Sequence, residues 1–224
     1  MNQQCGPFTL TQKTYGRGIS VLTRRDPDLA EAVSRWGPPP FWTHPPGFAG
    51  VVLAILSQQV SLESAHATFT RLENTAGSVD SENFLILDDT TLRQIGFSRQ
   101  KASYIRELAR EINGGHFALQ DLESMDDDQA RSKLRQARGI GAWTADTYLL
   151  FALRRSDAWP SGDLALAKAI QEVKGLSTTP GPEETDTIAA RWRPWRAVAA
   201  RILWHHYLNK RGRDASAQPL NGGD

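Results

Sequence analysis

The sequence is poor in cysteine and in long hydrophobic runs, and each lack excludes a class of protein. Its single cysteine, Cys5, cannot form an internal disulfide or supply the several thiolates of a zinc site or an iron–sulfur cluster. The longest apolar stretch, residues 48–56, is too short to span a bilayer, and residues 1–20 contain no signal-peptide core. We therefore expect no zinc, no iron–sulfur cluster, no membrane partner and a cytoplasmic location.

What is present is an ordinary globular composition with an uneven distribution of charge. The 224 residues are 40% hydrophobic and 23% charged, enough for one large core or two smaller ones, and the net charge is only +1. Residues 191–213, however, carry seven basic side chains and no acidic one. A second basic cluster follows an acidic stretch and comprises Arg131, Lys133, Arg135 and Arg138. Each cluster indicates either a solvated helical face or, if both lie on one surface, a polyanion-binding site.

Hydrophobic periodicity predicts an all-α fold, a compact arrangement of several short helices. Residues 1–47 are expected to be an N-terminal arm and a Pro-rich connector, with helices beginning after it. Residues 48–213 are expected to form a helical core, and the sequence leaves open whether this core is divided into two lobes that flank a cleft. Residues 214–224 are expected to be a flexible tail. The predicted helices span residues 48–72, 91–112 with a break at Gly96, 127–137, 142–154, 164–173 and 188–207.

The segment RGIGAWTADTY (residues 138–148) places two glycines between two of these helices. The short connection predicts a tight helical hairpin in which Ile140 turns inward. Gly139 and Gly141 permit positive φ and close approach of another backbone. Unpaired N–H groups at the start of the following helix, with its dipole behind them, form an anion site. The alternative is an ordinary αα-hairpin with a glycine cap.

Several segments resemble those of a known family. LRQARGIGAWTADTYLLFAL is similar to the helix-hairpin-helix of the DNA glycosylase superfamily, and DAWPSGDLALAKAI is similar to the Gly/Pro-rich loop and Asp that complete its motif. ILSQQVS, IGFSRQKASYIRELA and RWRPWRAVAARILW resemble segments of its alkylpurine branch, 3-methyladenine DNA glycosylase II, in the same order. The resemblance covers residues 48–207 and implies a compact form without the N-terminal α/β domain of larger members.

The resemblance implies how the hairpin binds DNA. A backbone phosphate would be bound by main-chain N–H groups of the hairpin residues Gly139, Ile140, Gly141 and Trp143. A monovalent cation, Na⁺ or K⁺, would be held there by main-chain carbonyls of Arg135, Ala137 and Ile140. Such contacts do not distinguish sequences, so binding should depend on phosphate contacts and salt.

The family's catalytic carboxylate corresponds to Asp163. From the residues alone, Asp163 is expected to be the N-cap of the next helix. The two roles are compatible, because a helix N-terminus stabilises an ionised carboxylate, which can act as a base or balance positive charge on the sugar. The rival carboxylates are Asp146, expected to be a surface acid, and Asp157, expected to lie in a loop or a cap.

Trp143 stands where bifunctional glycosylase/lyases carry a catalytic Lys, so the resemblance implies a monofunctional hydrolase without Schiff-base chemistry. Alkylation of a purine makes the base cationic, and Trp143 and Trp204 are the expected stacking residues. Thr147 and Leu164 complete the expected base pocket, at positions that are Tyr in the best-known bacterial member. Of the other tryptophans, Trp36, Trp42, Trp192 and Trp195 are expected to be structural, and Trp42 is also a candidate pocket wall.

A flipped base leaves a gap in the duplex, and the family's intercalating wedge corresponds to Gln59, with Gln58 beside it. Either glutamine could instead be a satisfied polar residue on a helix. The sequence does not distinguish which of the two is the wedge.

Together these features predict a monomeric hydrolase of base excision repair. It would remove 3-methyladenine or 7-methylguanine from duplex DNA by base flipping and leave an abasic site, with no obligate protein partner. The alternative is a non-catalytic, damage-sensing helix-hairpin-helix module, which would bind DNA in a salt-dependent way but release no base. The range of lesions and the role of residues 1–47 stay open.

Overall fold

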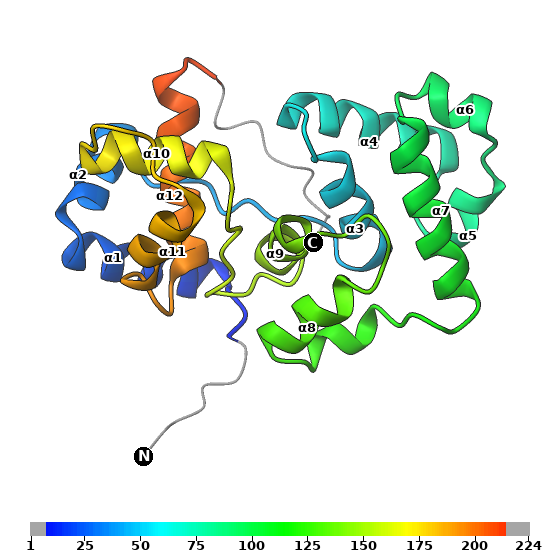
Figure 1. Ribbon diagram of the computed structural model, residues 1–224, viewed down its shortest axis with the longest axis horizontal. Coiled ribbons are helices and arrows are strands. Elements are labelled where there is room, and N and C mark those ends of the chain that lie inside the picture. The colour runs from blue at the N-terminus through cyan, green and yellow to red at the C-terminus, as the bar shows by residue number, and fades with distance from the viewer. Residues whose placement is uncertain (1–7, 214–224) are drawn as a thin grey trace. The chain divides into compact units, whose positions relative to one another are not determined.

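The computed structural model describes residues 8–213, so Cys5 and the expected tail at residues 214–224 lie outside the described residues. Within residues 8–213 there are twelve α-helices, one 3-10 helix and no strand (Figure 1). An isolated antiparallel bridge pairs Thr9 with Arg155. None of the helices in this range combines the length and hydrophobicity needed to cross a membrane. The predicted all-α fold class is confirmed.

The described chain divides into two compact units. The first comprises residues 8–43 and 149–213, and the second is His44–Tyr148. The division falls within helix α9, Ala142–Phe151. It does not coincide with the boundary expected at residue 47, because residues 8–43 share a unit with the C-terminal helices.

The first unit is built around its last helix. Its helices are α1 (Gln12–Arg25), α2 (Pro27–Trp36), α10 (Leu164–Lys174), α11 (Pro182–Ala190) and α12 (Arg196–Lys210). Helix α12 packs against the other four. Helices therefore begin before the Pro-rich connector, contrary to the sequence-based expectation. The local signals are present: Thr11 and Thr14 form a capping box, and Asp26 caps α2 ahead of Pro27.

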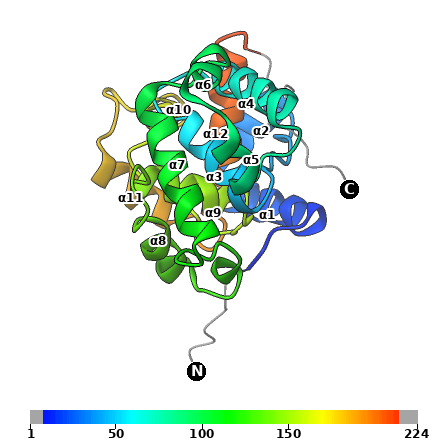
Figure 2. The ribbon, with the colours of Figure 1, turned by 90° about the vertical axis from the view of Figure 1, so that its right-hand side faces the viewer.

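The second unit surrounds a helix that is buried on all sides. Its helices are α3 (Gly47–Leu56), α4 (Leu62–Ala76), α5 (Ser81–Ile86), α6 (Asp89–Gln94), α7 (Arg99–Asn113), the 3-10 helix η1 (Gln120–Glu123) and α8 (Asp127–Leu134). Phe48 and every residue from Gly50 to Leu56 are buried, as the continuous apolar run predicts. Helix α7 packs against α3, α5 and α6, and Figure 2 shows it from the side.

Four predicted helices are broken or shortened. The helix predicted at residues 142–154 is α9, which ends at Phe151. The helix expected at residues 48–72 is interrupted at residues 57–61, where Gln59 has a φ of +57°. The helix expected at 188–207 is two helices, separated by a turn that contains Pro194, which has no N–H to donate. Helix α8 is capped by Asp126 and ends at Leu134, three residues earlier than predicted. The break at Gly96 is confirmed, with a φ of +106°.

Candidate functional site

The glycine hairpin is a turn between α8 and α9. Gly139 has a φ of +85°, and a Cβ there would clash with the ring of Tyr104. Ile140 is buried, as predicted. Gly141 differs from the expectation, because its φ is not positive and a Cβ there would meet no atom within 4 Å. The chain itself therefore requires glycine at position 139, whereas at position 141 glycine leaves open space beside the start of α9.

The expected wedge loop, residues 57–61, lies next to this hairpin in the same unit. The Nε2 of Gln58 donates to the carbonyl of Gly139 at 2.9 Å and to the Oγ1 of Thr144 at 2.8 Å. The Nζ of Lys101 donates to the carbonyls of Leu56 and Gln58 at 2.7 and 2.8 Å. Gln58 is thus a fixed connector between loop and hairpin, whereas the side chain of Gln59 is exposed.

A surface hollow of about 750 Å³ separates the loop from the hairpin. Gln59, Val60 and Arg135 line it together with Gly139 and Gly141. Val60 is 45% exposed. The two elements that the sequence analysis assigned to DNA binding therefore face the same hollow, which we call the hairpin hollow.

Most of the basic side chains in the two predicted clusters are paired within the protein. Arg138 pairs with Glu107 at 3.3 Å and Arg211 with Glu172 at 2.9 Å. Arg193 and Arg196 both pair with Asp157, at 3.0 and 2.9 Å. The positive charge available to a polyanion is therefore smaller than the counts of basic residues suggest, and the two clusters lie in different units.

The rival carboxylates are both engaged. Asp146 is buried, with a relative exposure of 4%, and accepts from the Nε of Arg131 at 2.8 Å. The expectation that Asp146 is a surface acid is therefore wrong. Asp157 lies in a loop and also accepts from the backbone N–H of Arg196 at 3.4 Å, so its expected role as a loop or capping residue is confirmed.

Asp163 is the N-cap of α10, as predicted. Its Oδ1 accepts from the N–H of Leu166 at 2.8 Å and from the Nε1 of Trp204 at 3.3 Å. The preceding loop is anchored by Asp186, whose two carboxylate oxygens accept from the Nε1 of Trp159 at 3.0 Å and the Oγ of Ser161 at 2.8 Å. A half-buried carboxylate is thus oriented by a helix N-terminus and by an indole ring.

The ring of Trp204 packs against a second aromatic ring. It stacks on Phe151 with centroids 5.4 Å apart and planes 18° apart. The guanidinium of Arg201 lies 5.2 Å from the centre of the Phe151 ring. This role of Phe151 was not predicted from the sequence, because an aromatic residue near the end of a predicted helix does not by itself indicate what it packs against.

Arg201 was grouped with the basic cluster, but it is a core residue with a relative exposure of 0%. It donates to the carbonyls of Trp42, Leu150 and Ala197 at 2.8, 3.0 and 3.0 Å. Burial lowers the pKa of Arg201 to about 10, and the charge of Tyr15 opposes this only in part. Assigning Arg201 to a surface cluster was therefore wrong.

The remaining predicted pocket residues are divided between the units. In the second unit, the Oγ1 of buried Thr147 donates to the carbonyl of half-exposed Trp143 at 2.7 Å. In the first unit, Leu164 is 62% exposed immediately after Asp163. Leu164 is therefore on the surface, next to the oriented carboxylate of Asp163.

The tryptophans predicted to be structural do have structural partners. The Nε1 of Trp36 donates to His206 at 3.2 Å, and that of Trp192 donates to Asp26 at 2.8 Å. Trp195 lies edge-on to Phe8, with centroids 5.6 Å apart. Trp42 is 5% exposed, so the structure gives it a core position.

With this geometry in place, the family can be established by comparison. Residues 52–194 match the HhH-GPD superfamily base excision DNA repair protein family, and this match covers more than half of the chain. The chain belongs to the HhH-GPD superfamily. The match includes the loop at residues 57–61, the hairpin and Asp163, and DNA is the partner on which members of this repair superfamily act.

Individual relatives agree with this membership. The chain is 27% identical over 197 residues to the alkylbase DNA glycosidase-like protein mag2 of Schizosaccharomyces pombe, covering 85% of this chain and 92% of that protein. It is 30% identical over 158 residues to the putative DNA-3-methyladenine glycosylase YfjP of Bacillus subtilis, covering 67% of this chain and 55% of that protein.

A solved structure shows the same fold. The Schizosaccharomyces pombe 3-methyladenine DNA glycosylase Mag1, in complex with abasic DNA, superposes with a TM-score of 0.75 at 24% identity. The superposition covers 84% of this chain and 95% of Mag1.

Proposed function

We propose that this HhH-GPD protein is a monofunctional DNA glycosylase that removes alkylated purines, of the 3-methyladenine and 7-methylguanine type, and leaves an abasic site in duplex DNA. The names of its relatives support this substrate class. A cytoplasmic location, in association with the nucleoid through DNA, belongs to the same proposal.

One observation carries the proposal: the hydrogen bond from Trp204 to the Oδ1 of Asp163 at 3.3 Å. It places the π system of an indole beside a carboxylate. An alkylated purine is cationic and is attracted to an aromatic face, while the sugar becomes cationic as the glycosidic bond breaks. The indole of Trp204 would therefore face the positive charge on the base, and the carboxylate of Asp163 would balance the positive charge on the sugar.

The reaction follows from these charges. The base leaves with the electron pair of the glycosidic bond, which neutralises the charge that alkylation had placed on it. Positive charge develops on the sugar and is balanced by ionised Asp163, whose orientation is fixed by Leu166 and Trp204. Water then adds to the sugar carbon and gives up its proton, for which Asp163 is the proposed acceptor. Trp143 and Trp204 would stack on the base, and Thr147 and Leu164 would line its pocket.

In this proposal the hairpin hollow receives the DNA backbone. Main-chain N–H groups of Gly139, Gly141 and Trp143 would bind a phosphate, and open space at Gly141 leaves room for it. The N–H of Ile140 was also expected to bind the phosphate, but it already donates to the carbonyl of Ala137 at 3.2 Å. Gln59 is the proposed wedge, because Gln58 is already bonded to Gly139 and Thr144 while Gln59 is exposed. The backbone of Gln59 has a positive φ, which is a strained conformation for a residue other than glycine. Strained backbone positions of this kind often occur at functional sites.

A monovalent cation would suit the same turn. The proposed ligands, the carbonyls of Arg135, Ala137 and Ile140, are neutral hard oxygens, which bind Na⁺ or K⁺. The carbonyl of Ala137 accepts one hydrogen bond, from the N–H of Ile140 at 3.2 Å, and has a second lone pair. Such a cation would add positive charge near the phosphate.

The first prediction tests Asp163. With methylated duplex DNA, the wild-type protein should release free 3-methyladenine or 7-methylguanine, detected by mass spectrometry. Asp163→Asn keeps an acceptor for the N–H of Leu166 but removes the charge, so release should fall at least about a hundredfold with little change in DNA affinity. The matched control is Asp80→Asn, since Asp80 caps α5 in the same way, accepting from the N–H of Asn83 at 2.8 Å.

Full activity in Asp163→Asn would refute the catalytic assignment. If the wild-type protein releases no base from any lesion yet binds DNA in a salt-dependent way, the glycosylase proposal fails and a non-catalytic damage-sensing module is the better description. Adducts trapped by borohydride would indicate a lyase, against which Trp143 argues because it offers no amine.

A further inference from the structure

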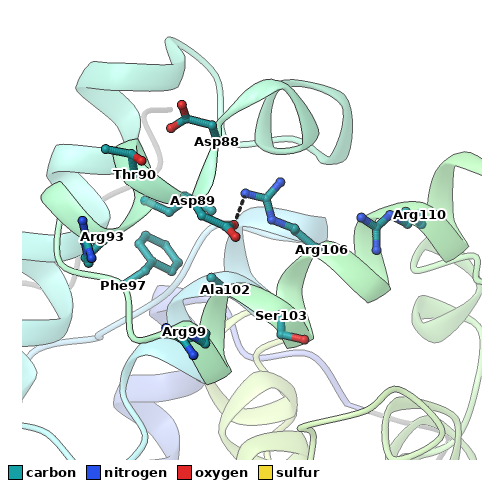
Figure 3. A pocket seen from close by; sticks show the side chains of 11 residues that line it. Asp88, Asp89, Thr90, Arg93, Phe97, Arg99, Ala102, Ser103, Arg106 and Arg110 are labelled. Carbon is teal, nitrogen blue, oxygen red and sulfur yellow. Dashed lines mark hydrogen bonds and ion pairs between the residues drawn. The ribbon is translucent and has the colours of Figure 1, made fainter.

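The second unit carries another hollow that the glycosylase proposal does not use. It lies between α6 and α7 and has a volume of about 750 Å³ (Figure 3). One wall is a row on α7 made of Arg99, Ser103, Arg106 and Arg110. The spacing of four, three and four residues places them on one face of the helix. We call this the arginine hollow.

Three of the guanidinium groups at this hollow are available to a ligand. Arg93, from α6, Arg99 and Arg110 are exposed, and in the described part of the chain no carboxylate lies within ion-pair distance of them. Arg106 is already held, because its Nη2 donates to the carbonyl of Leu87 at 2.8 Å and to Asp89 at 2.7 Å (Figure 3). Arg106 is therefore held in place by the protein, whereas Arg93, Arg99 and Arg110 face solvent.

The arginine hollow faces away from the hairpin hollow. Gln100, Lys101 and Tyr104, which line the hairpin hollow, lie about 90°, 170° and 130° round the axis of α7 from the arginine row, at 100° per residue. A duplex seated against the glycine hairpin would therefore lie on a different side of α7. The ligand of the arginine hollow is for this reason a different molecule, or a different part of one.

The opposite wall indicates which kind of anion fits. It carries the carboxylates of Asp88 and Asp89 and the hydroxyl of Thr90 (Figure 3). Asp88 accepts from the N–H of Thr91 and Asp89 accepts from Arg106, and the remaining lone pairs of both carboxylates can accept from a ligand. A DNA backbone offers only acceptors, so it could bind the arginines but not these oxygens. A peptide offers negative side chains for the arginines and N–H donors for the carboxylates. The two walls together suit a ligand with both features.

We propose that the arginine hollow binds an extended acidic segment of a partner protein. The arginine row spans about 16 Å at 1.5 Å per helical residue, which is the length of about five residues of extended chain. Acidic side chains near the two ends of such a segment would lie close to Arg99 and Arg110, the two arginines of the row that are exposed. The proposal does not depend on the glycosylase activity.

Fluorescence anisotropy tests the proposal at physiological ionic strength, where exposed charges are well screened. The probe is a fluorescein-labelled peptide in which Glu and Ser alternate, and the reference peptide alternates Gln and Ser. We expect the Glu peptide to bind the wild-type protein and the Gln peptide to bind much more weakly. The variant Arg99→Ala/Arg110→Ala should bind the Glu peptide at least about tenfold more weakly.

The matched control is Arg24→Ala/Arg25→Ala, which removes two exposed arginines at the end of α1 in the first unit. It should leave peptide affinity unchanged, and both double variants should keep wild-type DNA affinity and base release. Equal weakening by the two double variants would show non-specific charge attraction and overturn the proposal. Failure of the Glu peptide to bind, or loss of DNA affinity in Arg99→Ala/Arg110→Ala, would overturn it too, the latter by assigning the hollow to DNA.

Discussion

At the scale of single residues, Arg201 shows how a charge can serve as an interior connector. Its guanidinium joins the carbonyls of Trp42 and Leu150, which lie far apart in the sequence, and within residues 8–213 no carboxylate forms an ion pair with it. The rings of Tyr15, Phe41 and Phe151 lie 5.8, 5.5 and 5.2 Å from it. Aromatic faces and carbonyl oxygens together replace the water that the cation loses on folding.

The second prediction concerns this residue. In Arg201→Met the carbonyls lose their donors, at about 1 to 3 kcal/mol for each unsatisfied acceptor. Removal of a desolvated charge offsets part of this loss. We expect the free energy of unfolding, from urea titration, to fall by about 2 kcal/mol.

Arg191→Met is the control, because Arg191 is exposed in the same unit. Its effect should stay within about 0.5 kcal/mol. Equal stability of Arg201→Met and the wild-type protein would mean that the guanidinium does not connect these segments.

At the scale of elements, the turn between α8 and α9 separates two uses of glycine. Gly139 is required by the fold, because its φ is +85° and Tyr104 fills the space where a Cβ would be. Gly141 has no positive φ, and a Cβ there would meet no atom within 4 Å, so the described fold does not require glycine at this position. In the proposed function a phosphate binds there.

The third prediction compares these two glycines. Gly139→Ala should lower the free energy of unfolding by more than about 2 kcal/mol, since a left-handed conformation alone costs about 1 to 2 kcal/mol and the clash adds to it. Gly141→Ala should change stability by less than about 0.5 kcal/mol, yet weaken binding to duplex DNA about tenfold. Urea unfolding and DNA anisotropy separate the two effects. Unchanged DNA affinity in Gly141→Ala would remove the phosphate from this position.

Helices with caps and clear periodicity could be predicted from sequence, and loops that depend on tertiary contacts could not. Helix α10 was predicted to within one residue, with Asp163 as its cap. The interruption at Gln59 was not predicted, because a positive φ is uncommon for residues other than glycine and here depends on a tertiary contact. That contact is the hydrogen bond from the Nζ of Lys101 to the carbonyl of Gln58. Helices α1 and α2 were missed although Asp26–Pro27 is a local start signal.

The candidate site shows the same limit. The resemblance placed Asp163, Trp204 and the hairpin, and the structure orients Asp163 with Trp204. It could not tell Gln58 from Gln59, because the difference arises from a hydrogen bond to Gly139, 81 residues away in sequence. Nor could it show that Arg201 is buried, since a basic residue on a helix usually faces solvent.

At the scale of the whole molecule, the first unit is closed by ion pairs between segments distant in sequence. Asp26 is the centre of one such group: both carboxylate oxygens accept from the Nζ of Lys174 at 2.7 Å, and one accepts from Trp192 at 2.8 Å. The same carboxylate caps α2. Residues 8–43 are thereby attached to α10 and to the turn before α12.

The fourth prediction is a pH dependence of global stability. Burial alone would raise the pKa of Asp26, but hydrogen bonds from Lys174 and Trp192 outweigh it and hold the pKa below its ordinary value of 3.8. A carboxylate with a lowered folded-state pKa contributes stability above its unfolded pKa and loses that contribution as the pH falls through the folded value. Asp26→Asn should therefore cost about 1 to 3 kcal/mol at neutral pH.

The difference between Asp26→Asn and the wild-type protein should shrink as the pH falls below about 4. Thermal or urea unfolding across this range measures it. The control is Glu31→Gln on the exposed face of α2, which should follow the wild-type curve within about 0.5 kcal/mol. A difference that stays constant into acid would show that the charge of Asp26 is not what stabilises this group.

The anchoring of the loop at residues 57–61 has a thermodynamic consequence for encounters with DNA. Lys101 and Gln58 immobilise its backbone in the free protein. Ordering a flexible loop on association would subtract about 1 to 2 kcal/mol per residue from the affinity. Here that entropy is lost when the chain folds, so in the proposed function the exposed side chain of Gln59 would meet DNA without this ordering cost.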